Sequence, residues 1–390
     1  MNALALILVL LAPSLQDAPR EASRETILSG VRPILQQLRN QAPNYSPTRG
    51  ATPDLIVAKH QLRDWIESEL TELGEDDEVR AFERTLNDAL DDAELFCIDV
   101  GIECGDNNLG YVDGIRANRE RDFLVFITAT GVWCGYDESA YVYAWGGQGW
   151  RRFWENEQNS YTADAYLPQT IHDVDISSPD ANGDRLMMTL GSQASCAGSF
   201  KDVYVRVWEM NPDYQTALVL DWAEYANDGY PPIKGQVRPN DALFQFIAGG
   251  IIAGEGHWAV RHFEVLDGTS TQVDPVAVRP RDFAIEWSTA PWQESQTRSE
   301  SPSLEEWHTA LHREDGVGDF PDPTLRCTAG SGLWQVGTNF YNEPKRYYRV
   351  RWQEPYSFTM VGVSETPYPD CTVADPQGDA YPRLFQVNPD

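Results

Sequence analysis

Four segments of the chain repeat one order of hydrophobic and polar positions. They begin at Asp122, Asp184, Asp241 and Thr324. In each segment an apolar stretch is followed by a loop containing Gly or Ser, then by a stretch in which apolar and polar residues alternate, and then by a turn and a further strand-like stretch. Successive side chains of a strand point to opposite faces of a sheet, so this period of two predicts half-buried antiparallel strands.

The alternating stretches are rich in aromatic and aliphatic residues. They are Tyr141–Trp145, Val203–Trp208, Trp258–Phe263 and Tyr347–Trp352. Three of the segments are preceded by a further candidate strand, at Tyr111–Ala117, Thr170–Ser177 and Ile233–Val237. The sequence therefore predicts repeated four-stranded units.

Consecutive four-stranded antiparallel sheets are the units from which β-propellers are built. We therefore predict a mainly β fold in which repeated sheets of this kind form a propeller-like array of four or five blades, preceded by an N-terminal helical hairpin. Stacked meander sheets or a β-sandwich would give much the same pattern and remain the alternatives.

The residues ahead of the repeats have the periodicity of helices. Asp54 can cap the first helix and Gly74 ends it, and a second helix is predicted from Asp76 to about Glu94. The residues that recur at helical spacing are Leu55, Lys59, Leu62, Ile66 and Leu70 in the first helix and Val79, Phe82, Leu86 and Leu90 in the second. Together they predict an αα-hairpin over residues 54–94.

The start of the chain has the character of a signal peptide. Residues Ala3–Ala12 are apolar throughout, too short a run to span a bilayer, and cleavage could follow Ser14 or Ala18. No Lys or Arg precedes the run, which departs from the usual leader; a buried N-terminal helix or strand is the alternative. The predicted location is secreted or periplasmic, in the cell envelope, with no integral membrane segment after signal cleavage.

The predicted organisation has four parts. A signal peptide over 1–18 precedes a helix and linker over 19–53, and the helical hairpin over 54–94 follows. The repeated β-sheet domain covers 95–390 and contains a helical insertion near 300–315.

Six cysteines in an exported chain indicate disulfides. The favoured pairs are neighbours in sequence, equivalent positions of adjacent repeats, or residues that flank the last repeat: Cys97 with Cys104, Cys134 with Cys196, and Cys327 with Cys371. None of the spacings is typical of zinc sites, and free buried thiols are the alternative.

The charge of the chain is strongly negative, with 30 Lys and Arg against 60 Asp and Glu and a net charge of −30. Such a surface repels phosphate backbones and anionic lipids, so nucleic acid is excluded as a partner. The excess of acidic residues is explained by solubility, and binding of Ca²⁺ is the more specific alternative. No cofactor is predicted apart from Ca²⁺ at Asp180, Asn182 and Asp184, whose spacing is that of the first ligands of a calcium loop. A plain hairpin turn is the alternative there.

Acidic and histidine pairs provide the candidates for chemistry. Asp173 and Asp175 lie on one face of a predicted strand, and Asp137 and Glu138 are adjacent in a predicted loop. Paired carboxylates catalyse glycan hydrolysis, although pairs arise readily in so acidic a chain. His308 and His312 are four residues apart on a predicted helix and could hold zinc, with packing of an amphipathic helix as the alternative.

Aromatic residues supply the leading functional hypothesis. The chain has 13 Trp and 17 Tyr, and five aromatic residues lie in or between strands of the first repeat: Trp133, Tyr136, Trp145, Trp150 and Trp154. With no catalytic motif present, we predict a non-catalytic binding or protein-interaction module for a protein or glycan ligand, with Asp173 and Asp175 as further binding residues. A carboxylate-based glycan hydrolase and a Ca²⁺-stabilised structural protein are the alternatives, and the oligomeric state is left open.

Overall fold

The structure is a computed structural model, and it falls into two compact units, Met1–Pro168 and Gln169–Asp390, which are described separately. The residues it describes are 27–37, 40, 53–96, 110–132, 135–158, 169–193, 200–227, 233–248, 257–311, 324–327, 332–338, 345–353 and 357–374. The predicted signal peptide lies outside these residues.

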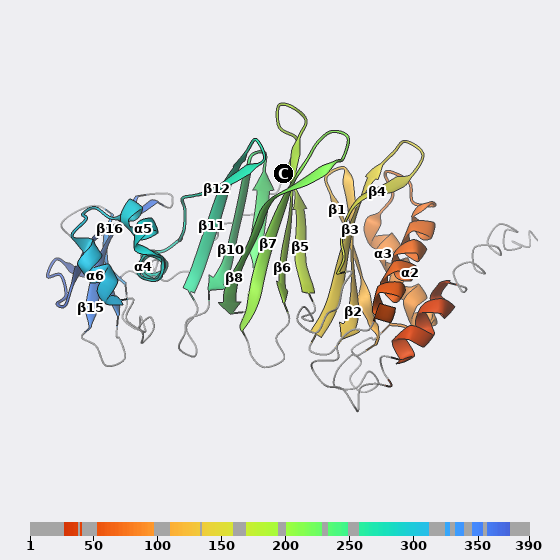
Figure 1. The fold of residues 1–390 in the computed structure, drawn as a ribbon, viewed down its shortest axis with the longest axis horizontal. Coiled ribbons are helices and arrows are strands. Elements are labelled where there is room, and N and C mark those ends of the chain that lie inside the picture. The colour runs from red at the N-terminus through yellow and green to blue at the C-terminus, as the bar shows by residue number, and fades with distance from the viewer. Residues whose placement is uncertain are drawn as a thin grey trace, which may run out of the picture. The chain divides into compact units, whose positions relative to one another are not determined.

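The first unit contains one four-stranded antiparallel sheet in the order β1-β2-β3-β4 (Figure 1). Its strands are β1 (Val112–Glu120), β2 (Phe123–Val132), β3 (Gly135–Trp145) and β4 (Trp150–Asn156). The first predicted repeat thus forms a single meander, and the candidate strand before it is the edge strand β1.

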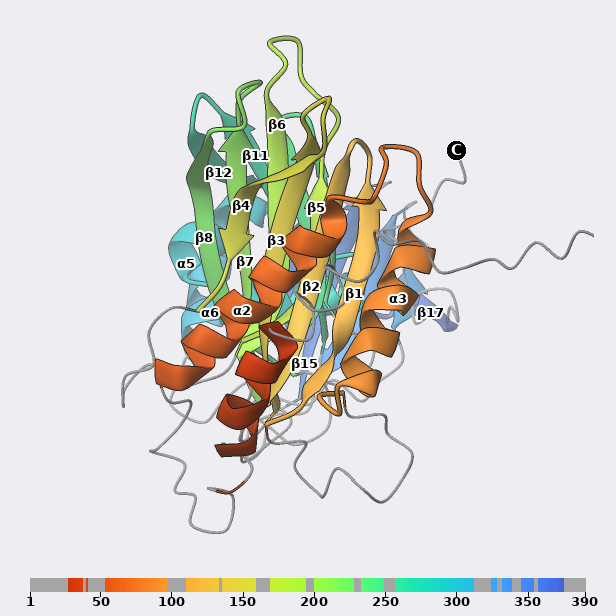
Figure 2. The ribbon, with the colours of Figure 1, turned by 90° about the vertical axis from the view of Figure 1, so that its right-hand side faces the viewer.

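Helices cover one face of this sheet, as Figure 2 shows. A helix over residues 27–37 is followed by α2 (Pro53–Leu70) and α3 (Val79–Asp92), where the helical periodicity predicted two helices. Their apolar stripes pack against side chains of the sheet, and the ring of Phe82 lies 6.1 Å from that of Phe126, edge to face. Burial of this apolar surface is what attaches the helices to the sheet.

Helix α3 also protects the free edge of β1. The side-chain amide of Asn87 donates to the carbonyl of Ile115 and accepts from its N–H, both at 2.9 Å. One turn away, the Glu83 carboxylate accepts from the N–H of Ala117 at 2.7 Å. These contacts replace the hydrogen bonds of a neighbouring strand, which leaves β1 without an open edge at this point.

The second unit begins with two further meanders. The first comprises β5 (Gln169–Ile176), β6 (Arg185–Gln193), β7 (Phe200–Met210) and β8 (Thr216–Asn227), and the second comprises β9 (Lys234–Arg238), β10 (Asp241–Ala248), β11 (His257–Leu266) and β12 (Thr269–Val273). A single pair, Ala248 with Ala226, joins β10 to β8.

Apolar side chains of these two meanders pack against each other to form one core. They include Met188, Leu190, Val205, Phe244 and Phe246. Strand β9 approaches β6 so closely that a Cβ added at Gly235 would lie 2.5 Å from a methyl carbon of Met188. A side chain at this position would force the Met188 side chain to shift, so glycine allows the close approach of β9 to β6.

The last sheet has the order β16-β15-β14-β13-β17. Its strands are β13 (Leu325–Cys327), β14 (Leu333–Thr338), β15 (Arg346–Gln353), β16 (Ser357–Ser364) and β17 (Cys371–Ala374). Before it come α4 (Pro280–Thr289), α5 (Trp292–Ser295), the 3₁₀ turn η2 (Gln296–Arg298) and α6 (Leu304–Leu311). Helix α4 was not predicted, because it is buried on nearly every side and so has no alternation of apolar and polar faces.

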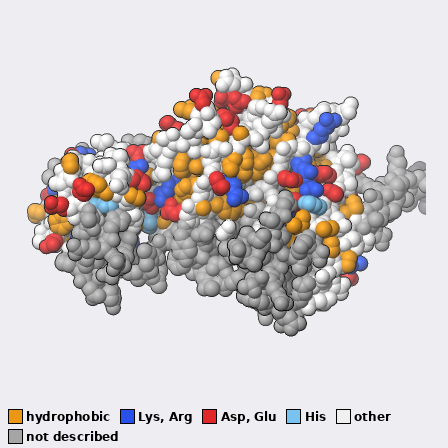
Figure 3. Space-filling view, viewed as in Figure 1, with side chains coloured by type: hydrophobic (Ala, Val, Ile, Leu, Met, Phe, Trp, Pro, Cys, Tyr) orange, Lys and Arg blue, Asp and Glu red, His pale blue; other side chains and the backbone are white. Residues whose placement is uncertain are grey.

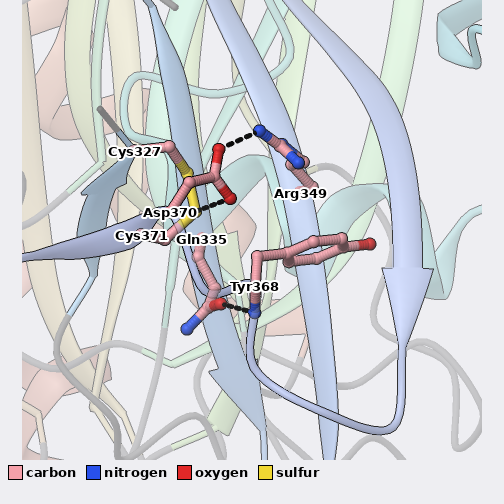
Figure 4. Close-up of a disulfide and its surroundings, with 6 residues drawn as sticks. All are labelled: Cys327, Gln335, Arg349, Tyr368, Asp370 and Cys371. Atoms are coloured by element: carbon pink, nitrogen blue, oxygen red, sulfur yellow. Dashed lines mark hydrogen bonds and ion pairs between the residues drawn. A yellow bond between two sulfur atoms is a disulfide. The ribbon is translucent and has the colours of Figure 1, made fainter. Parts of the chain in front are cut away.

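A disulfide ties the edge strand β17 to the last sheet (Figure 4). Cys327 and Cys371 are opposite each other in β13 and β17 and are bonded, as predicted. Beside them Asp370 pairs with Arg349 at 2.5 Å, and Gln335 accepts a hydrogen bond from the N–H of Tyr368 at 2.7 Å. The other predicted disulfide residues, Cys97, Cys104, Cys134 and Cys196, lie outside the described residues.

The predicted fold class is confirmed. The chain is mainly β, with N-terminal helices and repeated four-stranded antiparallel meanders. Each alternating stretch singled out in the sequence is the third strand of its meander, namely β3, β7, β11 or β15. Among the described residues, no helix combines the length and apolar character needed to span a bilayer.

Candidate functional site

Two of the predicted aromatic residues lie together at the β3–β4 hairpin. Trp145 and Trp150 are opposite each other in the sheet, their ring centroids are 5.3 Å apart, and both are half-buried. The Arg119 guanidinium lies over the Trp150 ring at 5.3 Å from its centroid. The hairpin therefore presents an aromatic pair with one cation stacked beside it.

The other predicted aromatic residues do not join this pair at the surface. Trp154 is buried, with 7% of its surface exposed, and its role as a binding residue stays a prediction. Tyr136 is half-buried on β3, and Trp133 lies outside the described residues.

The predicted acidic pair Asp137 and Glu138 lies within strand β3, not in a loop. Asp137 accepts from the ammonium of Lys59 on α2 at 3.0 Å, and both side chains are almost fully buried. Glu138 is paired with Arg116 at 3.0 Å. Each carboxylate is thus held by a cation of its own unit, and the two do not face a common substrate position.

The predicted pair Asp173 and Asp175 lies on strand β5. Asp173 is exposed and accepts from the N–H of Val174 at 2.9 Å. Asp175 accepts from the N–H of Val237 at 2.7 Å, which links β5 to β9. Asp175 therefore has a role in joining two meanders, through a hydrogen bond from the backbone of β9.

The candidate calcium loop is a closed turn. One carboxylate oxygen of Asp180 accepts from the N–H groups of Asn182 and Asp184 at 2.8 and 2.9 Å, and the other accepts from the Asn182 side chain at 3.4 Å. Gly183 supplies the positive φ of 90° that the turn requires. This is the hydrogen bonding of an Asx turn, which needs no metal.

The candidate zinc residue His308 is part of the core. It is 1% exposed, its Nε2 lies 3.0 Å from the carbonyl oxygen of Trp287, and its ring packs edge-on against the Trp287 ring. The zinc alternative is therefore corrected to packing for His308, and His312 lies outside the described residues. Among the described residues, one cluster has the geometry for metal ligation, Cys327, Asp370 and Cys371, but its sulfur atoms are joined as a disulfide.

A network of four titratable side chains in the second unit was not predicted. Glu286 on α4 lies 2.6 Å from Nε2 of His257 and accepts from Arg261 at 2.8 Å. Arg261 also donates to both oxygens of Glu224 on β8, at 2.8 and 3.1 Å. His257 and Arg261 are four residues apart on β11 and so point to one face of their sheet. The network therefore joins α4 to the β8 and β11 strands.

Aromatic rings surround the arginine of this network. The Arg261 guanidinium is 5.5 Å from the Phe246 ring centroid and 6.0 Å from that of Trp222. Trp222 and Glu224 are two residues apart on β8 and share a face. Because the guanidinium is stacked and also bonded to two carboxylates, it is fixed in one orientation.

The two carboxylates of the network have opposite pKa shifts. Burial alone would raise the pKa of Glu286, but the Arg261 guanidinium and the His257 ring lower it to about 2. Burial raises the pKa of Glu224, and the pairing with Arg261 offsets this only in part. Such a split is typical of acid–base pairs in enzymes, and it also arises in structural ion networks.

A small cavity lies beside Glu286. Its volume is about 10 Å³, which is roughly the space that one water molecule needs. The lining residues are Val276, Phe283, Glu286, Trp287, Ala290, Glu294, Ser295 and Arg298. This cavity is too small to hold a sugar ring beside the Glu286 carboxylate.

A second buried network lies between α2 and the sheet of the first unit. Its centre is the fully buried Glu157 carboxylate, which contacts Arg63 and His60 at 3.2 Å each. The Tyr141 hydroxyl donates to the same carboxylate at 2.9 Å. Burial and the Glu157 charge raise the pKa of Tyr141 well above its usual value, so this hydroxyl stays protonated and acts as a donor.

No protein-family model and no curated protein matches the sequence. Among solved structures, an α-L-arabinofuranosidase from Clostridium thermocellum aligns with a TM-score of 0.24 and 9% identity, over 64% of this chain and 72% of its own. A thermostable family-43 glycoside hydrolase aligns with a TM-score of 0.23 and 10% identity, over 67% of this chain and 78% of its own. A GH32 β-fructofuranosidase from Bombyx mori aligns with a TM-score of 0.22 and 11% identity, over 63% of this chain and 49% of its own. Likeness at this level carries no argument about the activity of this chain.

Proposed function

We propose that this chain is an exported, non-catalytic binding protein of the cell envelope or extracellular space, and that its ligand is a glycan held at the Trp145–Trp150 pair. One observation carries the proposal. The acidic pairs Asp137–Glu138 and Glu224–Glu286 are engaged by cations of the fold, whereas the aromatic pair is half-buried at the end of a hairpin.

The surroundings of the aromatic pair favour access by a ligand. Between the two tryptophans, the turn residues Gly147 and Gly149 have no atom within 4 Å of the position that a Cβ would take. Gln148 and Arg151, which flank the pair, are exposed and can donate hydrogen bonds to hydroxyl groups. An indole face packs against the apolar C–H face of a sugar ring, and polar neighbours fix the orientation of the ring.

The test is binding to a glycan array by the wild-type protein, Trp145→Ala and Trp145→Phe. We expect the alanine variant to lose about tenfold or more in affinity, the usual loss at an aromatic hot spot, and the phenylalanine variant to keep part of it. Trp208→Ala is the matched control, because Trp208 is a half-buried tryptophan on β7 of the other unit. Retention of full affinity by Trp145→Ala, or an equal loss in Trp208→Ala, would contradict the proposal.

The hydrolase alternative is separated by a turnover assay on the same glycans. We expect no release of reducing sugar from any of them. Release that is abolished by Glu224→Gln, with binding retained, would replace the binding proposal with an enzyme. In that case Glu224 would be the proton donor, because its raised pKa favours the protonated form.

A further inference from the structure

One side of strand β8 has no partner strand among the described residues over most of its length. At 12 residues β8 is the longest described strand, and on its other side it pairs with β7 from end to end. On the open side a single pair, Ala226 with Ala248, joins it to β10, so the edge from Thr216 to Glu224 is unpaired within the described part of the chain. The edge of β1 differs, because helix α3 closes it with side-chain hydrogen bonds.

The register of the β7–β8 hairpin identifies the backbone groups on this open side. The Asn211 N–H donates to the carbonyl of Gln215 at 3.1 Å, and from there every second pair of the hairpin exchanges hydrogen bonds. Val219 is the extra residue of a bulge in β8, and β7 has no extra residue, so the alternation can be followed along β7. The residues of β8 whose N–H and C=O groups point away from β7 are then Thr216, Leu218, Asp221 and Ala223. Within the described structure no backbone hydrogen bond reaches these groups.

The side chains beside the open edge are accessible and share one face of the sheet. Leu218 is 51% exposed and lies opposite the half-buried Trp208 of β7. The Asp221 side chain is 56% exposed and pairs at 3.1 Å with Arg206, which lies opposite it on β7. Opposite residues of an antiparallel pair lie on the same face, so an apolar pair and a charged pair adjoin the edge. Figure 3 shows hydrophobic side chains exposed over the meanders of the second unit, with isolated charged side chains among them.

We propose that the open edge of β8 binds an extended segment of a protein partner, which adds a strand to the sheet and places an apolar side chain beside Leu218 and a cationic one beside Asp221. The chemistry of the edge selects this occupant, because backbone donors and acceptors at strand spacing are matched by another strand. The net charge of −30 repels a second copy of the chain and attracts a cationic segment. The edge belongs to the second unit, so the inference goes beyond the glycan contact proposed for the first.

The experiment uses the full chain and, as the probe, a short fluorescein-labelled peptide of alternating valine and lysine, with binding followed by fluorescence anisotropy. A second peptide has the same sequence but a methyl group on every backbone nitrogen, so it keeps the side chains and has no backbone donor.

Two variants alter the edge itself. Ala223→Pro removes an N–H on the open side without removing a hydrogen bond to β7, and its matched control Ala223→Val keeps that N–H. Asp221→Asn removes the charge beside the edge, and its matched control is Asp213→Asn, an equal change of charge at an exposed residue of the β7–β8 turn.

We expect methylation of the peptide and Ala223→Pro each to weaken binding about tenfold or more, since both remove backbone hydrogen bonds, and Ala223→Val to change it less than about twofold. Asp221→Asn should weaken binding about threefold at low salt, more than Asp213→Asn does, and this loss should shrink at high salt.

Three outcomes would overturn the proposal. The wild type binds the methylated peptide as tightly as the unmodified one, or binds neither; this comparison needs no variant to fold. Ala223→Pro, with an unchanged circular dichroism spectrum, binds like Ala223→Val. The wild type self-associates and Ala223→Pro abolishes this, which would make a second copy the occupant. Trp145→Ala should leave peptide binding unchanged, so failure of the glycan proposal and failure of this one are separate results.

Discussion

Helix α2 in the first unit and helix α4 in the second are both attached to a sheet by buried charge, but the two attachments are built differently. Lys59 of α2 lies on the same helical stripe as apolar core residues and reaches one carboxylate, Asp137, together with the carbonyl oxygen of Gln158. Glu286 of α4 contacts both His257 and Arg261, and Arg261 also holds Glu224.

The difference shows what each attachment can do. Burying a charge costs several kcal/mol of desolvation, which a partner offsets only when the geometry is good. A single pair such as Lys59–Asp137 mainly fixes the position of the helix along the sheet. A network that contains two carboxylates with opposite pKa shifts makes the attachment of α4 depend on pH as well.

The largest effect is expected from removing the shared carboxylate. Glu286→Ala leaves His257 and Arg261 with one partner fewer in a buried site, and we expect the free energy of unfolding to fall by about 5 kcal/mol, the upper end for breaking a buried ion pair. Denaturant titration measures the change. The control is Glu305→Ala on the exposed side of α6, which should change stability by less than about 0.5 kcal/mol. A loss of similar size in both variants would mean that the network adds no stability of its own.

The single pair should be the weaker attachment. Lys59→Met leaves the Asp137 carboxylate buried without its cation, and we expect a loss of about 3–4 kcal/mol. Lys59→Met combined with Asp137→Leu removes both charges, and we expect its stability to return close to that of the wild type. Denaturant titration of the wild type, Lys59→Met and the double variant measures these changes. A double variant as unstable as Lys59→Met alone would show that packing, and not charge, accounts for the loss.

The sequence predicted the strands better than the sites, and Lys59 shows why. Its spacing from Leu55 and Leu62 placed it correctly on the buried stripe of α2, because helical periodicity is a local property. Its partner Asp137 is 78 residues away, and no local pattern connects the two. Asp137 was expected in a loop, whereas in the structure it lies within β3, where the lysine makes its charge compatible with a buried strand.

The network around Glu286 could not be predicted for the same reason. Its members come from β8, β11 and α4, and their contacts depend on how two meanders and a helix pack. A weak local signal was present, since Glu286 stands within the apolar stretch from Phe283 to Trp287, where a lone acid indicates a buried partner. By contrast, the Cys327–Cys371 pair was predictable, because the two residues flank the last repeat, and its first and last strands, β13 and β17, lie side by side.

Acid should weaken the α4 attachment in a defined window. The folded-state pKa of Glu286 is about 2 against an ordinary value of 4.5, so its contribution is fully present above pH 4.5 and is lost as the pH falls toward 2. This difference between the two pKa values corresponds to about 3 kcal/mol in the free energy of unfolding. Denaturant titrations of the wild type and Glu286→Gln across this window should show a steeper acid loss in the wild type.

Glu224 provides a control, because its pKa shift has the opposite sign to that of Glu286. Its pKa is raised in the folded state, so its contribution to stability is present at low pH and is lost as the pH rises through that value. It therefore opposes the effect of Glu286, and Glu224→Gln should make the acid loss steeper than in the wild type. Parallel pH profiles for all three proteins would contradict the assignment of the two shifts.

The smallest effect concerns an attachment without charge, the contact of α3 with the edge of β1. Asn87→Ala removes both hydrogen bonds to Ile115 and leaves its N–H and carbonyl without these partners, so we expect a loss of about 2 kcal/mol. Asn87→Asp is the informative companion, because a carboxylate can still accept from the N–H of Ile115 but cannot donate to its carbonyl. Its stability, measured by denaturant titration near neutral pH, should fall below that of the wild type. If both variants matched the wild type, apolar packing of α3 would suffice to hold it on β1, and the hydrogen bonds would serve mainly to close the edge against pairing with another strand.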